Sequence, residues 1–174
     1  IYEKIANNLS KKDSLLNKSF NINERIKESS KRNKIRLGIC SNFLYSHSVG
    51  ICYLRIIEDF VNSGIEVIIF RDINQKVDSI TKHIESITSR TILLPNKLDK
   101  SCELILKESI DILYYLDLGM NPKTYLMSLS RLALVQVLGG GHPCTSGSPN
   151  MDYFISSKFL ETEHSDKCYS ERLI

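Results

Sequence analysis

Length, composition and charge bound the class of protein. The chain has 174 residues, of which 42% are apolar and 25% are charged, enough for one globular domain with a buried core. This composition excludes a disordered chain, and no apolar run approaches the roughly 20 residues that a membrane span needs. No secretory signal is visible, because the amino-terminal segment is polar and rich in Lys and Asn.

The net charge of +3 is unevenly distributed along the chain. Residues 1–36 contain ten Lys or Arg and four Asp or Glu, a balance of +6, so residues 37–174 sum to −3. No basic surface interleaved with aromatic residues is visible, so the lysines favour a solvated linker or helix face over a nucleic-acid-binding face. We therefore expect no nucleic acid among the partners.

The cysteines indicate a reducing compartment. Their number is odd and no Cys-x-x-Cys spacing occurs, which argues against a zinc site and against a disulfide framework. They are Cys40, Cys52, Cys102, Cys144 and Cys168. We expect a cytoplasmic protein without a metal.

Residues 1–34 are low in apolar content. Ile1, Ile5 and Leu9 have helical spacing, which predicts the last helix of a preceding helical domain. Residues 11–34 then form a polar connection, with a short helix expected around 22–26. Because the chain begins without Met and residues 170–174 are typical of the start of a new extended segment, we expect a fragment of a longer protein.

Strands and helices alternate from residue 35 onward. Continuous or alternating apolar runs predict strands at 35–40, 65–70, 90–94, 110–116, 132–138 and 152–155. Apolar residues at helical spacing predict helices from near Val49 to a stop at Gly64, over 77–87 and over 99–108. Asp99 is a plausible cap of the third of these helices. Asn121 and Pro122 open a fourth as its cap and first-turn residue.

This alternation predicts an α/β fold with a parallel, doubly wound, Rossmann-like sheet covered by helices on both faces. Three loops that leave strand carboxyl ends have unusual polar content: 41–50, 117–121 and 139–150. Ligands of open α/β sheets bind at that edge, so we expect the three loops to gather there and form the site.

The third loop is the most distinctive stretch of the chain. Residues 139–150 hold four of the eight glycines and two of the four prolines. Its glycines allow close approach of a ligand, and its hydroxyls and successive main-chain N–H groups suit an anion or a sugar. His142 either orients a substrate or holds the loop together. Cys144 has no helix N-terminus or basic neighbour to lower its pKa, so no thiol nucleophile is expected.

Two further residues have both a functional and a structural interpretation. His47, just before the first of these helices, suits a general base or a hydrogen-bond donor, but a loop histidine that caps or packs locally is the stronger expectation from the residues alone. Asp117 either accepts hydrogen bonds from a substrate or forms the turn near Asn121. His83 and His164 are expected to be incidental. Neither a dinucleotide fingerprint nor a phosphate-binding P-loop is present.

Several separate motifs, in order, resemble one family. Residues 133–137 (ALVQV), 141–147 (GHPCTSG), 151–153 (MDY) and 169–173 (YSERL) resemble the catalytic region of O-linked N-acetylglucosamine transferases, the SPINDLY-like glycosyltransferases of family 41. Residues 46–50 (SHSVG) look like the family's His-Pro-Val-Gly loop, with serine in place of the more usual proline. The resemblance covers roughly residues 35–174.

The Gly-His-Pro form, with residues 117–120 (DLGM) upstream, looks more like the bacterial branch than the animal enzymes, which have Gly-Tyr-Pro. The resemblance implies the amino-terminal lobe of a GT-B fold and an inverting, metal-independent transfer. The sugar, GlcNAc or another hexose, would move from a nucleotide donor, with UDP expected, to a protein Ser or Thr or a similar acceptor. No cofactor is implied.

The resemblance also implies roles for particular residues. His47 carries over as the general base, and the turn of Pro143, Thr145, Ser146 and Gly147 as the sugar and diphosphate side of the cleft. The full set expected to bind substrate is Gly50, Asp117, Gly119, His142, Pro143, Thr145, Ser146 and Gly147.

The family's main nucleotide-binding residues lie in a second, carboxy-terminal lobe, which this sequence lacks. We therefore expect residues 1–34 to be the junction to tetratricopeptide helices, residues 35–174 to be the first lobe, and the chain alone to be inactive. Two alternatives stay open: a non-catalytic α/β binding module that keeps the fold, and, more weakly, another GT-B enzyme such as a sugar epimerase.

Overall fold

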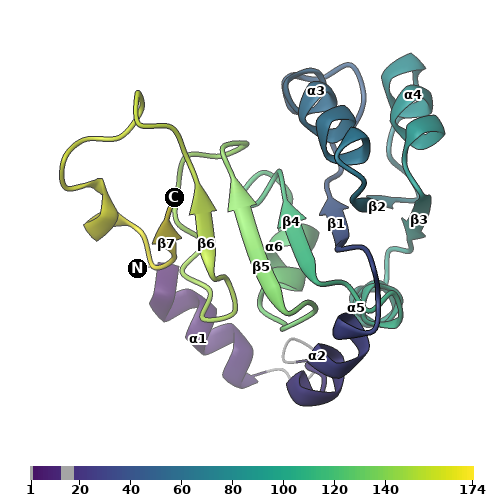
Figure 1. Ribbon diagram of the computed structural model, residues 1–174. Coiled ribbons are helices and arrows are strands. Elements are labelled where there is room, and N and C mark those ends of the chain that lie inside the picture. Colours follow the sequence, from purple (N-terminus) through teal and green to yellow (C-terminus); the bar gives the residue numbers. More distant parts are fainter. Residues whose placement is uncertain (1, 13–17) are drawn as a thin grey trace.

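The computed structural model of the chain describes residues 2–12 and 18–174 (Figure 1). Its centre is a seven-stranded parallel sheet with the order β3-β2-β1-β4-β5-β6-β7. The strands are β1 (Arg36–Cys40), β2 (Glu66–Asp72), β3 (Arg90–Leu94), β4 (Ile112–Tyr115), β5 (Val135–Gly139), β6 (Tyr153–Ile155) and β7 (Arg172–Leu173). The predicted Rossmann-like α/β fold is therefore confirmed, and β3 has the predicted bounds.

Helices cover both faces of the sheet. Helices α3 (Ser48–Asn62) and α4 (Ser79–Ile87) pack on one face, where Leu37 and Ile39 of β1 point. Helices α5 (Leu98–Lys107) and α6 (Pro122–Ser128) pack on the other face. Figure 1 shows α3 and α4 standing together, apart from α5. The continuous apolar strands follow from this burial on two sides.

Two element ends, at α5 and β5, differ from the sequence expectations, and the start of α6 agrees with them. Asp99 does not cap α5: Lys97 occupies the N-cap position without a side-chain hydrogen bond, and Asp99 lies in the first turn, where a carboxylate still favours the helix dipole. Strand β5 begins three residues later than predicted, because Leu132 and Ala133 are fully buried in an irregular segment before it. The cap at Asn121 is confirmed, since its Oδ1 accepts from the backbone N–H groups of Lys123 and Thr124.

The described part of the segment before residue 35 lies against the sheet domain. It forms α1 (Tyr2–Lys12) and α2 (Ile22–Ser30). Ala6 is fully buried and packs with Leu129. Lys18 Nζ pairs with Glu103 at 2.9 Å, and an Arg25 guanidinium N–H donates to the carbonyl of Leu106 at 3.0 Å. The domain boundary at residue 34 stays a prediction, but these contacts hold α1 and α2 against the α5 and α6 side.

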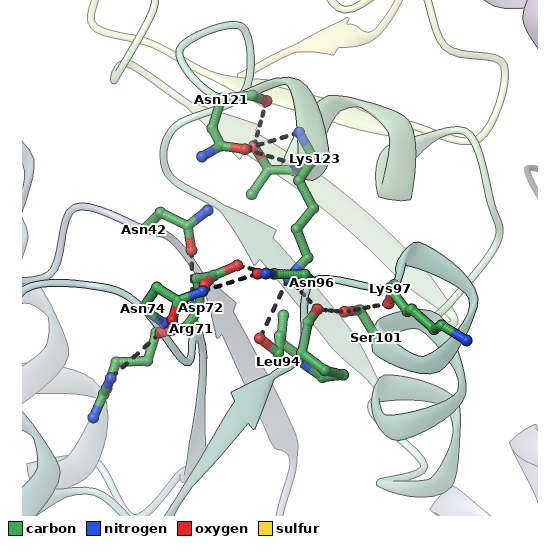
Figure 2. Close-up of polar contacts among 12 residues, drawn as sticks. Asn42, Arg71, Asp72, Asn74, Leu94, Asn96, Lys97, Ser101, Asn121 and Lys123 are labelled. Carbon is green, nitrogen blue, oxygen red and sulfur yellow. Dashed lines mark hydrogen bonds and ion pairs between the residues drawn. The ribbon is translucent and has the colours of Figure 1, made fainter.

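A lysine ties three elements together at the carboxyl end of the sheet (Figure 2). The Nζ of Lys123, from the first turn of α6, donates to Asp72 Oδ2 at 2.7 Å and to the carbonyl of Pro95 at 2.6 Å. Burial alone would raise the pKa of Asp72, but hydrogen bonds from Lys123 and from the backbone of Asn74 lower it below its usual value. The network therefore fixes the ends of β2 and β3 relative to α6.

Replacing Lys123 by Met should destabilise the fold by about 2 kcal/mol, because the partly buried carboxylate of Asp72 loses its cation. Urea unfolding followed by circular dichroism measures the change. Lys82→Met on the exposed side of α4 is the matched control and should change stability by less than about 0.5 kcal/mol. Equal effects of the two variants would contradict the role of Lys123.

Candidate functional site

Two of the three predicted loops meet at the carboxyl edge of the sheet and form a pocket of about 380 Å³. The loop between β4 and α6 contributes one wall, the glycine-rich loop after β5 a second, and α1 adds a side chain at the rim. The lining residues are Ile5, Leu118, Gly119, Met120, Asn121, Pro122, Tyr125, His142, Cys144, Thr145 and Ser146. Four of the predicted site residues, Gly119, His142, Thr145 and Ser146, are therefore brought together.

Glycines allow the two loops to approach closely. A Cβ on Gly141 would lie 1.8 Å from the carbonyl oxygen of Leu116, so only glycine permits this contact. Gly119 has φ +93°, and a Cβ there would lie 3.1 Å from the ring of His142. The imidazole of His142 therefore lies against the backbone of the β4–α6 loop.

The turn at residues 145–147 is held by a buried carboxylate. Glu171, which is 5% exposed, accepts hydrogen bonds from the Thr145 hydroxyl at 2.7 Å, from the Ser146 backbone N–H at 2.9 Å and from the Ser146 hydroxyl. The backbone N–H of Gly147 donates to the hydroxyl of Ser170 at 3.1 Å. The motifs at residues 141–147 and 169–173, which are separated in the sequence, are thus joined by hydrogen bonds in the fold.

These contacts limit the ability of the turn to bind an anion through its main-chain N–H groups. The sequence suggested that its successive main-chain N–H groups would bind an anion, but those of Ser146, Gly147 and Ser148 already have protein acceptors. The Ser146 N–H donates to the carboxylate of Glu171, and the other two donate to the hydroxyl oxygens of Ser170 and Ser146. That expectation is wrong for these three N–H groups, because each already donates to an acceptor within the protein.

His142 is the polar side chain of the pocket with free hydrogen-bonding capacity at both ring nitrogens. Neither nitrogen has a hydrogen-bond partner among the residues that the structure describes. The side chain is half-buried, so it is reachable from the pocket. Pro143 next to it is exposed, and neither Pro143 nor Gly147 belongs to the lining.

His47 lies apart from this pocket lining. It is the N-cap of α3: its Nδ1 accepts from the backbone N–H of Val49 at 3.2 Å, and its ring lies 4.7 Å from that of Phe43. The accepting Nδ1 places the proton of the neutral ring on Nε2. The local capping interpretation is therefore confirmed. Gly50 is buried in α3, where a Cβ would meet the Tyr45 carbonyl oxygen at 2.1 Å, so it makes room for the loop backbone.

Asp117 is fully buried at the end of β4. One carboxylate oxygen accepts from the backbone N–H of Asn42 at 2.8 Å, which links the loops after β1 and β4. The other oxygen, Oδ1, has no partner within the described part of the chain. Burial raises the pKa of Asp117 to about 6, against the lowering effect of the bond from Asn42. Asp117 does not line the pocket, although it directly precedes the lining residue Leu118.

Sequence reasoning missed Glu171 and Tyr125 as site residues. Tyr125 follows the Asn121 cap by one helical turn, and its hydroxyl donates to the carbonyl of Ser146 at 3.3 Å. Glu171 lay within a motif that was noted, but its contact with residues 25 positions earlier has no signal in a single sequence. Within the ranges 2–12 and 18–174, no group of three or more His, Cys, Asp or Glu is placed to hold a metal. No helix over the same ranges is long and apolar enough to cross a membrane.

Comparison with known proteins finds similar solved structures. No protein-family model matches the chain, and no curated protein is significantly similar to it. Among solved structures, a mutant O-GlcNAc transferase of Thermobaculum terrenum is similar, with a TM-score of 0.72 and 28% sequence identity. The match covers 81% of this chain but only 27% of the chain of that structure. The chain therefore has a glycosyltransferase-like fold and corresponds to a little over a quarter of that enzyme.

Adjacent glycines test the contact between the two loops. Gly141→Ala should destabilise the fold by about 3 kcal/mol, because its Cβ would overlap the Leu116 carbonyl. Gly140→Ala is the matched control: no atom lies within 4 Å of its added Cβ, so the change should stay within about 0.5 kcal/mol. Chemical denaturation measures both, and a tolerated Gly141→Ala would refute the close approach.

The raised pKa of Asp117 predicts a pH-dependent stability. Because the folded-state pKa of about 6 lies above the unfolded value of about 3.9, folding favours the protonated form, and stability falls as pH rises through this window. Asp117→Asn should therefore gain about 2 kcal/mol relative to the wild type between pH 4 and pH 7.5. Urea midpoints at both pH values measure this gain. Asp166→Asn, at an exposed position, should show none.

Proposed function

We propose that the chain is the amino-terminal lobe of a GT-B glycosyltransferase that transfers a hexose, GlcNAc or another, from a nucleotide sugar to a Ser or Thr hydroxyl of a protein. The observation that carries the proposal is the match to an O-GlcNAc transferase over 81% of the chain. The loops at the carboxyl edge support it, because they meet in a pocket where sheet proteins of this class bind ligands.

In the proposed reaction the acceptor hydroxyl attacks the anomeric carbon from the face opposite the leaving nucleotide, so the configuration inverts. A base removes the hydroxyl proton as the bond forms. The negative charge that develops on the diphosphate is stabilised by a lysine and a helix N-terminus of a second lobe outside this chain. The reaction uses no metal and no cofactor, and the five free cysteines are in keeping with a cytoplasmic enzyme.

His47 is the proposed base. Its hydrogen bond at the N-terminus of α3 limits which ring nitrogen can accept a proton. With Nδ1 accepting the Val49 N–H, the neutral ring carries its proton on Nε2 and can donate there but not accept. To act as a base through Nε2, the ring must exchange tautomer and release the cap, which costs about 1 kcal/mol. A positioning role, with Nε2–H donating to substrate, involves no such cost.

The second candidate is a non-catalytic α/β binding module. The observation that favours it is the commitment of His47 to the helix cap and of the 145–147 turn to Glu171. The weaker epimerase alternative is exposed by product analysis with a labelled donor. A complete protein with a second lobe and transfer activity excludes the module.

A pair of His47 variants separates the cap from the chemistry. In the full-length protein, His47→Asn keeps an acceptor for the Val49 N–H, so stability should hold within about 0.5 kcal/mol, whereas His47→Ala should lose about 1 kcal/mol. If the imidazole takes part in transfer, both variants should lose about 100-fold or more in kcat. Transfer of labelled GlcNAc from UDP-GlcNAc to protein measures this.

His83→Asn, at an exposed histidine of α4, is the control and should leave transfer unchanged. Full activity of His47→Asn would show that His47 only caps α3. The 174-residue chain by itself should not transfer sugar, and ordinary turnover by this chain would contradict the assignment to one lobe of two.

A further inference from the structure

The pocket is lined without a single charged side chain. All eleven lining residues are uncharged when His142 is neutral. Lys123, in the first turn of α6, is turned to Asp72 and to the carbonyl oxygens of Leu94 and Pro95, so its three donors are taken (Figure 2). A diphosphate in this pocket would find no cation among the lining residues.

Two carboxylates lie directly behind the pocket walls. Glu171 accepts from Thr145 and Ser146, which both line the pocket. Asp117 is buried next to the lining residue Leu118. Their fields oppose a bound anion, since screening by water is weak for buried charges. The electrostatics of the pocket therefore select against the charged part of a nucleotide sugar.

Most polar side chains of the lining are already hydrogen-bonded inside the protein. The hydroxyls of Thr145 and Ser146 bond to Glu171, and that of Tyr125 donates to the Ser146 carbonyl. The Oδ1 of Asn121 caps α6. Among the described residues, the imidazole of His142 and the amide nitrogen of Asn121 remain, with the weakly bonding thiol of Cys144. A sugar would lose the hydration of several hydroxyls here and regain few hydrogen bonds from side chains.

The remaining surface of the pocket is apolar. Leu118, Met120, Pro122 and the ring of Tyr125 form its walls, and Ile5 of α1, 44% exposed, stands at the rim. The volume of about 380 Å³ lies within the range of ligand pockets, which combine apolar walls with a few placed polar groups. The pocket suits an apolar side chain whose neighbouring peptide groups meet His142 and Asn121.

We propose that this pocket binds the protein acceptor: it takes an uncharged, apolar side chain next to the Ser or Thr that receives the sugar, while the donor diphosphate binds elsewhere. The inference rests on the proposed transferase function. It replaces the expectation, implied by the family resemblance, that Thr145 and Ser146 face the sugar and diphosphate. His142 hydrogen-bonds the acceptor backbone and sets the register of the peptide.

The test uses the full-length protein and a capped peptide, Ac-Ala-Leu-Pro-Ser-Val-Ala-Gly-NH2, labelled for fluorescence anisotropy. Replacing its Leu and Val by Asp should weaken binding about tenfold or more, because a charge would enter an apolar pocket backed by two carboxylates. A photoreactive leucine analogue in the same peptide should cross-link to the segments 118–125 or 142–146. UDP should not displace this cross-link.

Matched variants locate the binding. Ile5→Asp at the pocket rim should weaken peptide binding about fivefold or more, while Ile26→Asp on α2, at a similar exposure of 51%, should change it less than twofold. Both positions are on exposed helix surfaces, so both variants should keep the fold, which thermal melting by circular dichroism checks.

Three results would overturn the inference: no peptide binding at millimolar concentration, cross-linking outside the two segments, or loss of the cross-link on addition of UDP. These outcomes are separable from a failure of the proposed function. Peptide binding at the pocket without sugar transfer would keep the site and remove the transferase. Sugar transfer with an unaffected Ile5→Asp variant would keep the transferase and remove the site.

Discussion

The buried carboxylate of Glu171 is the interaction on which the candidate site depends. It accepts from a backbone N–H and two hydroxyls of the 145–147 turn, and none of these donors is a charged group. A buried anion held by neutral donors is stable only while every bond is made. The shape of the turn is therefore fixed by a residue on the opposite side of β6, and this residue also places a negative charge behind one wall of the pocket.

Besides the bonds of Glu171, close contacts at two glycines and the hydrogen bonds of Lys123 hold the loops at the carboxyl edge of the sheet. Gly141 allows the glycine-rich loop to touch the end of β4, and Gly119 leaves room for the ring of His142. Lys123 joins α6 to the ends of β2 and β3. These contacts hold the loops at the carboxyl edge, and with them the walls of the pocket, through interactions within the protein.

Much of the fold was predictable because it is set by local patterns. Apolar runs gave the positions of the strands, and Asn121 with Pro122 gave the start of α6, since both signals act within a few residues. The site was only partly predictable. The bonds of Glu171 and the packing of Gly50 under Tyr45 are long-range or depend on loop path. The separation of His47 from the pocket arises because its loop is anchored to α4, where the Ser46 N–H donates to Asp78 at 2.8 Å.

The position of Glu171 also has a consequence for how the protein folds during synthesis. The turn at 145–147 leaves the ribosome about 25 residues before the carboxylate that shapes it, and this carboxylate directly precedes β7, the edge strand that pairs with β6. Until then the donors of the turn are bonded to water. Bringing the two segments together later costs chain entropy, because it closes the loop between them. The turn of the candidate site is thus shaped after most of the sheet has been synthesised, and a nascent chain released before Glu171 would lack the bonds that fix this turn.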